Sequence, residues 1–308
     1  MKIVYLDEGS VGDACLDGLR SLGEYTGYHN STREESLERV RDCEVLIINK
    51  VAVDAVLMDR APKLRLVCVS ATGTDNIDLD AAAARGIIVR NVAGYSTESV
   101  VQATFTHLLS LLGRSAYFDA YVKDGRYSEG GLFTNSLMPF TELAGKAMGI
   151  VGMGTIGSRV AQVACAFGMD VAYYSTSGTS HCTAYPSLPL GELLRRSDVV
   201  SIHAPLNSRT GGLIGKAELA MMKPGAVLLN LGRGGILDEE ALAAALDAGT
   251  IAGAALDVYS REPLPSDSPL LHLLHPERIS LSPHRAWASR ESLSRLLSAV
   301  EENIRKGW

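Results

Sequence analysis

The stretch AMGIVGMGTIGSRVAQVACAFG, residues 147–168, decides the fold. It begins as a short apolar strand, continues through the glycine pattern Gly152, Gly154 and Gly157, and ends as a helix with apolar residues at helical spacing. Between a strand and a helix, the first glycine permits a tight turn, the second lets the backbone approach a pyrophosphate, and the third packs the helix on the strand. The helix amino terminus adds N–H groups and partial positive charge for phosphates. A glycine-rich turn without a ligand is the weaker alternative, so we predict a dinucleotide site.

The residue that usually selects NAD is missing. In this fold an acidic residue about twenty positions further on holds the ribose 2′-hydroxyl, but here Ser175 ends the next strand, DVAYYST. No Lys or Arg lies between Val171 and Leu194 to pair with a 2′-phosphate. Ser175, Thr176 and Ser177 can bind either form of the ribose, or can be ordinary solvated turn residues. We expect NAD as the cofactor and leave NADP open.

Apolar runs on both sides of this motif predict two parallel sheets. After residue 168 the strand candidates are DVAYYST, SDVVSIHAP, GAVLLNLG, TIAGAALDV and RISLSPH, separated by segments of helical length. Before residue 93 they are KIVYLD, EVLIINK, LRLVCVS and IIVRNV. A long helix over 99–112 follows, and 116–143 is expected to form loop and short helix. The final helix, about 289–304, has no strand after it, so we expect it to pack back on a discontinuous first domain.

Composition narrows the class of protein. A chain of 308 residues exceeds the usual size of one core, and 46% hydrophobic residues with 21% charged ones indicate a well-packed chain. The net charge of -6 argues against a broad nucleic-acid-binding face. The opening MKIVYLDEGS contains an acidic pair, and no run of about 18 apolar residues follows, which predicts neither signal peptide nor membrane span. We expect a cytoplasmic protein.

Cysteines and histidines give no sign of a metal site. The five cysteines show no CxxC pair, and their odd number does not describe a disulfide framework. The seven histidines show neither HExxH nor a cysteine–histidine cluster. We therefore expect no metal.

Three polar residues follow predicted strands at the carboxyl edge, where an open α/β sheet places its ligands. Arg233 follows GAVLLNLG, Glu262 follows IAGAAL in DVYSREP, and His284 follows RISLSP. Reduction of a 2-oxo acid needs a cation for the carboxylate, a proton donor for the nascent alkoxide, and a group that keeps the donor charged. Arginine, histidine and glutamate suit these roles in turn. Singly, each residue can equally belong to a surface turn, a loop or a capped helix; their order after the glycine motif favours catalysis.

The other histidines have weaker claims. His203 ends DVVSIHAP beside Ala204 and Pro205, where it can contact the nicotinamide side of the cofactor or satisfy the backbone at a strand end. For its ring we favour the second. His107 lies on an apolar helix and is expected in the core or at a domain interface.

Taken together, these motifs resemble the D-isomer-specific 2-hydroxyacid dehydrogenases over essentially the whole chain. The resemblance rests on ATGTDNID (71–78), NVAGYSTESV (91–100), the glycine motif (152–157), NLGRGGILD (230–238), ALDVYSREP (255–263) and SPHRAW (282–287). It implies a Rossmann dinucleotide-binding domain (99–285) inserted in a discontinuous flavodoxin-like substrate domain (1–98 and 286–308). It also implies a cleft between the domains and a homodimer formed through the inserted domain.

By the same resemblance, Arg233 would bind the substrate, Glu262 would orient and charge His284, and His284 would donate the proton. Thr72 and Gly73 would offer backbone N–H groups to the substrate carboxylate. The cofactor would be lined by Val100, Gly152, Gly154, Thr155, Ile156, Gly157, Ser175, His203, Ala204, Pro205, Leu231, Gly232, Arg233, Asp257, His284 and Trp287. Asp257 would lie near the nicotinamide amide, with Val100 behind the nicotinamide ring.

Within the family the motifs look most like the glycerate dehydrogenase/hydroxypyruvate reductase branch, so hydroxypyruvate and D-glycerate are the expected substrate pair. Two departures stand out: Ser175 replaces the usual Asp, and Arg285 follows the catalytic His where the family normally has an apolar residue. Arg285 can contact substrate or cofactor phosphate or point to solvent, and we favour solvent. The alternatives are a dinucleotide-sensing regulator resembling the family's corepressors, and a dehydrogenase of another small anion such as formate or phosphite.

Overall fold

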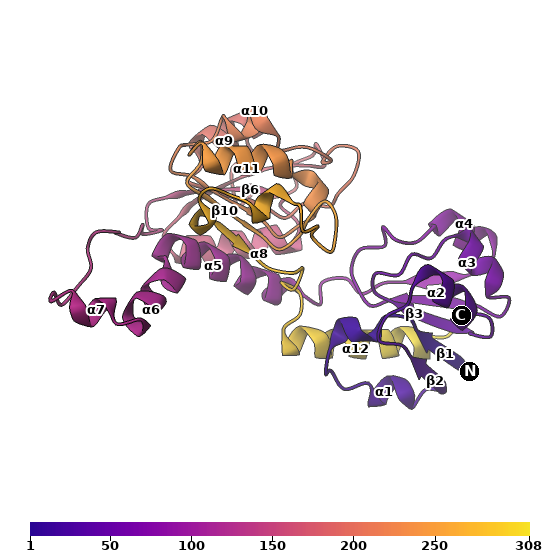
Figure 1. Ribbon diagram of the computed structural model, residues 1–308. Coiled ribbons are helices and arrows are strands. Elements are labelled where there is room, and N and C mark those ends of the chain that lie inside the picture. The colour runs from indigo at the N-terminus through magenta and orange to yellow at the C-terminus, as the bar shows by residue number, and fades with distance from the viewer. The chain divides into compact units, whose positions relative to one another are not determined.

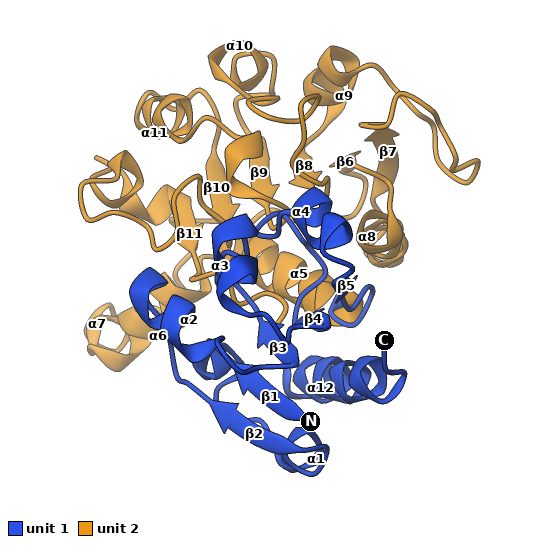
Figure 2. Ribbon diagram, turned by 90° about the vertical axis from the view of Figure 1, so that its right-hand side faces the viewer, with its two compact units in different colours: residues 1–96, 288–308 blue, residues 97–287 orange.

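The computed structural model describes residues 1–308, which form two compact units. Unit 1 comprises Met1–Ser96 and Ala288–Trp308, and unit 2 comprises Thr97–Trp287 (Figure 2). The predicted domain boundaries, 98 and 286, differ from this division by two residues each. The chain therefore leaves unit 1 for unit 2 and returns to it for the last helix.

Unit 1 is built on a five-stranded parallel sheet. Its strands are β1 (Lys2–Tyr5), β2 (Glu24–Gly27), β3 (Val45–Ile48), β4 (Leu66–Val69) and β5 (Ile88–Arg90). The strand order is β2-β1-β3-β4-β5, which is the flavodoxin-like doubly wound order. Every residue of β3 and β4 is buried, because helices cover both faces of the sheet.

The edge strand β2 was missed by the sequence analysis. Its sequence, EYTG, contains one large apolar side chain, and all four residues are exposed or half-buried. An edge strand with little buried surface carries no apolar run, so the pattern used for the other strands has nothing to detect.

Side-chain caps explain where four of the five helices of unit 1 begin. The helices are α1 (Asp17–Arg20), α2 (Arg33–Arg39), α3 (Ala55–Arg60), α4 (Leu79–Ala84) and α12 (Arg290–Arg305), with a 3-10 turn at Glu8–Val11. Thr32, Asp54, Asp78 and Ser289 each cap a helix through a side-chain oxygen. Helix α12 contacts α1 and β4 (Figure 1) and buries Leu296, Leu297, Val300 and Ile304. The final helix thus lies in unit 1 with the first 96 residues.

Unit 2 is built on a six-stranded parallel sheet. Its strands are β6 (Ala147–Val151), β7 (Asp170–Tyr174), β8 (Val199–Ile202), β9 (Val227–Asn230), β10 (Gly253–Leu256) and β11 (Ile279–Leu281), in the order β11-β10-β9-β8-β6-β7. A single parallel bridge from Tyr173 to Ser187 adds a residue pair beyond β7. The chain runs from β6 to β7 on one side and then to β8 on the other. This reversal beside β6 is the switch point at which doubly wound sheets bind ligands.

Helices cover both faces of this second sheet. They are α5 (Thr97–Gly113), α6 (Ser115–Lys123), α7 (Arg126–Glu129), α8 (Thr155–Ala166), α9 (Leu190–Arg196), α10 (Lys216–Leu219) and α11 (Glu239–Asp247), with 3-10 turns at Gly234–Ile236, Pro269–Leu271 and Pro276–Arg278. One apolar cluster joins α5 and α8 to the sheet, and another joins α9, α10 and α11 to it. Helices α6 and α7 extend away from this sheet (Figure 1), and neither buries a residue. No helix is long and apolar enough to cross a membrane.

Candidate active site

The three predicted catalytic residues follow three neighbouring strands of unit 2. Arg233 follows β9, Glu262 follows β10 and His284 follows β11, and these strands pair in parallel in that order. Parallel neighbours end at the same edge, so the segments after them meet there.

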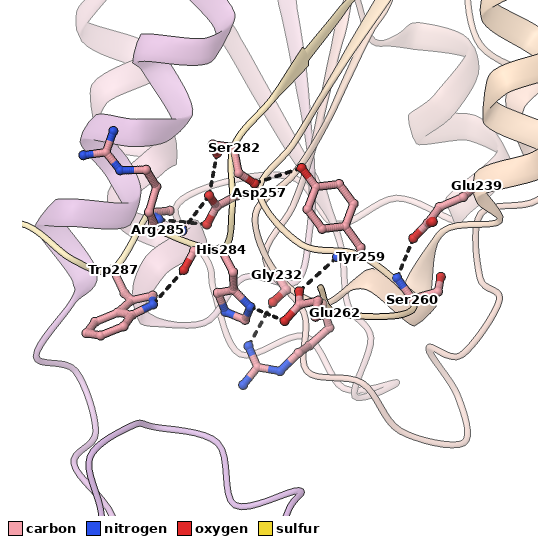
Figure 3. Close-up of polar contacts among 12 residues, drawn as sticks. Gly232, Glu239, Asp257, Tyr259, Ser260, Glu262, Ser282, His284, Arg285 and Trp287 are labelled. Carbon is pink, nitrogen blue, oxygen red and sulfur yellow. Dashed lines mark hydrogen bonds and ion pairs between the residues drawn. The ribbon is translucent and has the colours of Figure 1, made fainter. Parts of the chain in front are cut away.

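His284 and Glu262 form the central contact of this edge (Figure 3). His284 Nδ1 lies 2.7 Å from Glu262 Oε2, and the two side chains are 21% and 29% exposed. The other carboxylate oxygen, Oε1, accepts a hydrogen bond of 3.0 Å from the Tyr259 N–H, which orients the carboxylate. Because Nδ1 faces Glu262, Nε2 is the ring atom left for a ligand. The predicted pairing of these two residues is therefore present in the structure.

The segment that carries His284 is held in an unusual backbone conformation. His284 has a φ of 47°, in the left-handed region that side chains rarely adopt. The Asp257 carboxylate, 1% exposed, accepts hydrogen bonds from Ser282 Oγ (2.5 Å), Arg285 N (2.9 Å) and Ala286 N (2.8 Å). A strained residue persists only where its surroundings enforce it. Asp257 therefore anchors the backbone on both sides of His284.

This role of Asp257 was missed by the sequence analysis, which expected the side chain near the nicotinamide amide. Both carboxylate oxygens are engaged by residues 282–286, and the nicotinamide contact stays a prediction. Two neighbours strengthen the same segment: Trp287 Nε1 donates to the His284 carbonyl at 2.8 Å, and the Tyr259 hydroxyl donates to the Ser282 carbonyl at 2.9 Å. Burial raises the pKa of Tyr259 to about 12, so its hydroxyl remains a donor.

Helix α5 supports the segment from behind. His107 lies 2.8 Å from Ser280 Oγ through Nδ1 and 3.0 Å from Ser282 Oγ through Nε2. Burial lowers the pKa of His107, so its ring is neutral at neutral pH. Ser99 Oγ donates to the Ala286 carbonyl at 2.6 Å. His107 is thus half-buried against β11 and linked through Ser282 to Asp257.

The loop that carries Arg233 is set by its own hydrogen bonds and by a close backbone approach. Asn230 Nδ2 donates to the Arg233 carbonyl at 2.9 Å, and Arg233 Nη1 donates to the Gly232 carbonyl at 2.9 Å. A Cβ on Gly234 would lie 1.9 Å from the Tyr259 carbonyl carbon. Only glycine lets the loop after β9 touch the loop that carries Glu262. Figure 3 draws Gly232 beside the His284–Glu262 pair.

The glycine motif has the geometry that a dinucleotide requires. Gly152 has a φ of 95°, and a Cβ there would lie 2.8 Å from the His203 carbonyl oxygen. A Cβ on Gly157 would lie 2.1 Å from the Gly152 carbonyl oxygen, so α8 packs directly on the turn. Above Gly154 a Cβ would meet nothing, and no side chain caps α8. Open space thus lies over uncapped helix N–H groups, which include those of Thr155 and Ile156, as a pyrophosphate needs.

His203 lies just after β8. Its Nε2 lies 2.8 Å from Ser201 Oγ, and its buried Nδ1 has no hydrogen-bond partner. Burial lowers the pKa of His203 to about 4, so the ring is neutral. Ala204 is 4% exposed beside it, and the exposed Pro205 accepts a hydrogen bond from Thr210 Oγ1 through its carbonyl. The ring thus contacts the Ser201 side chain and no backbone group, and a cofactor contact of this segment stays a prediction.

The remaining predicted residues are placed as follows. Val100, Leu231 and Ala286 are buried in one apolar cluster of unit 2. Arg285 is exposed, and Figure 3 draws its side chain pointing away from His284. Thr72 and Gly73 follow β4 in unit 1, where Thr72 Oγ1 donates to the Val92 carbonyl at 2.9 Å. No group of three or more His, Cys, Asp or Glu side chains could hold a metal ion.

Comparisons with known proteins place this chain in a family. The profile described as "D-isomer specific 2-hydroxyacid dehydrogenase, NAD binding domain" matches residues 105–286, more than half of the chain. A glyoxylate reductase of Korarchaeum cryptofilum is 40% identical, with 87% of this chain and 80% of the relative covered. A hydroxypyruvate reductase of Blautia hydrogenotrophica is 35% identical, with 99% and 96% covered. The solved NADPH-dependent glyoxylate/hydroxypyruvate reductase of Sinorhizobium meliloti, in complex with citrate, has a TM-score of 0.84 at 28% identity, with 99% and 93% covered. The chain belongs to the D-isomer-specific 2-hydroxyacid dehydrogenases, a family of NAD(P)-dependent oxidoreductases.

Proposed function

We propose that this protein reduces hydroxypyruvate to D-glycerate with NAD(P)H, and catalyses the reverse reaction. The observation that carries the chemistry is the 2.7 Å contact between His284 Nδ1 and Glu262 Oε2 at the end of β11. The choice of substrate draws on relatives named hydroxypyruvate reductase and glyoxylate reductase. Both names describe the reduction of a small 2-oxo acid.

Arg233 is the proposed substrate-binding cation. Its guanidinium presents donors in a planar fork, which suits two hydrogen bonds to a carboxylate or to a carboxylate and a ketone oxygen. The Gly232 carbonyl takes one of these donors and fixes the plane of the fork. We propose that Thr72 and Gly73 of unit 1 add backbone N–H groups to the same carboxylate.

His284 is the proposed proton donor. When bound, the reduced nicotinamide would supply the hydride that the ketone carbon receives. The ketone oxygen then needs one proton, which the imidazolium gives from Nε2 as the C=O bond becomes C–OH. Glu262 fixes the orientation of the ring through its contact with Nδ1, which leaves Nε2 for the substrate. In the reverse reaction the neutral ring takes the proton back at the same atom.

Unit 2 is the proposed dinucleotide-binding domain and unit 1 the proposed substrate domain. We propose that Gly152, Gly154 and Gly157 would hold the pyrophosphate at the amino terminus of α8, and that Ser175, just beyond β7, would contact the adenosine. Toward the nicotinamide we place Val100, the segment 203–205, Leu231, Gly232, Asp257 and Trp287. The open space above Gly154 supports this direction.

Steady-state kinetics test the function. NADPH and NADH oxidation would be followed separately with hydroxypyruvate, glyoxylate, pyruvate and a longer 2-oxo acid. Rapid turnover of hydroxypyruvate is expected. Turnover of another acid alone would keep the mechanism and overturn the substrate, whereas tight cofactor binding without turnover of any acid would indicate a dinucleotide-sensing regulator.

We further propose a homodimer formed through the arm, defined as residues 115–140 of unit 2. Four apolar side chains of this arm are strongly exposed: Leu132 (71%), Phe133 (89%), Leu137 (89%) and Phe140 (68%). Exposed apolar groups of this size gathered on one segment favour a protein interface. Light scattering should give a dimer mass for the wild type and a monomer mass for a Phe133→Ser/Leu137→Ser variant. A monomeric wild type would overturn this proposal.

The proposed compartment is the cytoplasm. All five cysteines are free, and Cys15 and Cys165 are exposed. Exposed free thiols suit a reducing compartment.

A further inference from the structure

We propose that Arg209, together with Ser175 and Ser177, binds the 2′-phosphate of NADPH, and that the protein therefore binds NADPH in preference to NADH. The inference rests on the dinucleotide-binding role of unit 2 and does not depend on which 2-oxo acid is reduced. No Lys or Arg lies between Val171 and Leu194 in the sequence. The structure brings one from the loop after β8.

The position of Ser175 relative to the glycine turn decides which part of the cofactor it meets. Strand β7 pairs with β6 in the register Tyr174 to Val151, and the Gly152 N–H donates to the Tyr174 carbonyl at 3.0 Å. Ser175 is therefore the first residue beyond β7, directly beside the pyrophosphate turn. In this fold the residue at that place contacts the 2′ position of the adenosine ribose.

Arg209 is held at the same place by a contact across 32 residues of sequence. Its Nη1 donates to the Ser177 carbonyl at 2.8 Å and lies 3.9 Å from the position of a Cβ on Gly178. The side chain is exposed and forms no ion pair with a carboxylate. A guanidinium has five N–H donors, so four remain for a phosphate once Nη1 has given one.

The surroundings favour an anion. No Asp or Glu lies between Val171 and Gly191 or between His203 and Gly215, the two stretches that meet here. Ser175 Oγ and Ser177 Oγ lie 3.1 Å apart, and both donate to the Thr179 carbonyl, at 2.6 and 2.9 Å. Hydroxyls rotate, so both can turn a donor toward a phosphate. The carboxylate that would repel a 2′-phosphate is replaced by two hydroxyls and a cation.

Calorimetric binding of 2′,5′-ADP and 5′-AMP to the full-length protein tests the inference without any turnover. The two probes differ only in the 2′-phosphate. The wild type should bind 2′,5′-ADP about tenfold or more tightly than 5′-AMP, since a charge-assisted contact is gained. Arg209→Gln should reduce that difference to about twofold with little change for 5′-AMP. Arg209→Lys should restore part of it.

Two further variants sharpen the test. Ser175→Asp should weaken the binding of 2′,5′-ADP and leave the binding of 5′-AMP unchanged, because the new carboxylate repels the 2′-phosphate. Arg196→Gln is the matched control. Arg196 is an exposed arginine of α9 that pairs with Glu192, and it lies just before β8 begins, at the opposite edge of the sheet. Its loss should change the affinity for neither probe.

Equal affinities for the two probes in the wild type would overturn the preference for NADPH. A preference retained by Arg209→Gln would overturn the role of Arg209. Selective 2′,5′-ADP binding in a protein that does not reduce hydroxypyruvate would count against the proposed function alone.

Discussion

The two ends of the carboxyl edge of the second sheet are built in opposite ways. At the β9–β11 end, defined as residues 230–236, 257–262 and 282–287, a carboxylate that is 1% exposed holds the strained His284 backbone through three hydrogen bonds. At the β7 end, defined as residues 175–180 and 207–210, the contacts are made by the half-buried Ser175, the exposed Ser177 and the exposed Arg209. Catalysis requires atoms held in fixed positions, whereas selection between two cofactors requires only a few side chains that favour one cofactor or disfavour the other. Substitutions at the β9–β11 end should therefore change kcat or the free energy of unfolding. Substitutions at the β7 end should change only the affinity for the cofactor.

The largest effect is expected from His284→Asn. Loss of the proton donor should lower kcat for 2-oxo acid reduction by about 10²–10⁴-fold, with cofactor Kd changed less than about threefold. The measurement is steady-state kinetics beside NADPH titration. The control is His275→Asn, since His275 is also near a glutamate, Glu277, but at 3.5 Å and at the surface. An unchanged kcat in the His284 variant would show that His284 is not the proton donor.

The loops after β9 and β10 approach each other closely at Gly234, so a substitution there should cause a large loss of stability. Gly234→Ala forces a Cβ into the Tyr259 backbone and should lower the free energy of unfolding by about 2–4 kcal/mol. Gly235→Ala is the control, because its Cβ would meet only the flexible Leu206 side chain, at 3.3 Å, and should cost less than about 1 kcal/mol. Urea denaturation compares the two. Equal stabilities would show that the loops can separate at little cost.

His203, which ends β8, gives a prediction about pH. Burial lowers its pKa to about 4, whereas an unfolded chain titrates near about 6.5. Between these values the unfolded chain binds more protons, so the stability from the neutral ring is complete above about pH 6.5 and is lost as the pH falls toward 4. The loss is at most about 3 kcal/mol.

The variant His203→Gln removes this titration. The difference in unfolding free energy between variant and wild type should shift in favour of the variant when urea denaturation is moved from about pH 7.5 to about pH 4.5. The same difference at both pH values would mean that the ring is not buried as a neutral group.

The smallest effect at the β9–β11 end is expected from Glu262→Gln. A neutral amide oxygen accepts the Nδ1–H of His284 more weakly than a carboxylate does, so the ring is held less firmly and kcat for reduction should fall about tenfold. The Tyr259 N–H can still donate to the amide oxygen, which preserves the loop. Glu277→Gln, beside the surface His275, is the matched control and should leave kcat unchanged. An unchanged kcat in the Glu262 variant would contradict the proposed role of the pairing.

Much of the fold could be predicted because its causes are local. Apolar runs marked four of the five strands of the first sheet and all six of the second, and the glycine motif lies where a strand meets a helix. The strand β2 escaped because an edge strand buries little surface. The three catalytic residues could be named because each follows an apolar strand, and their roles stay predictions until the variants are measured.

The contacts that hold those three residues in place could not be predicted from the spacing of residues in the sequence. Asp257 and Ala286 are 29 residues apart, and His107 meets Ser282 across 175 residues. Such contacts depend on the order of strands in the sheet and on which helix covers which face, and neither is encoded in a short window of sequence.

The amino-acid sequence by itself determined the parallel α/β architecture, the glycine turn and the identity of the residues able to bind an anion and move a proton. Periodicity and backbone freedom are properties of neighbouring residues, so they can be seen in the chain before it folds. The tertiary structure alone decided that Asp257 holds the His284 segment, that Gly234 lets two loops touch, and that Arg209 reaches Ser177. These depend on which distant side chains meet at a sheet edge, and only the packed sheet brings them together.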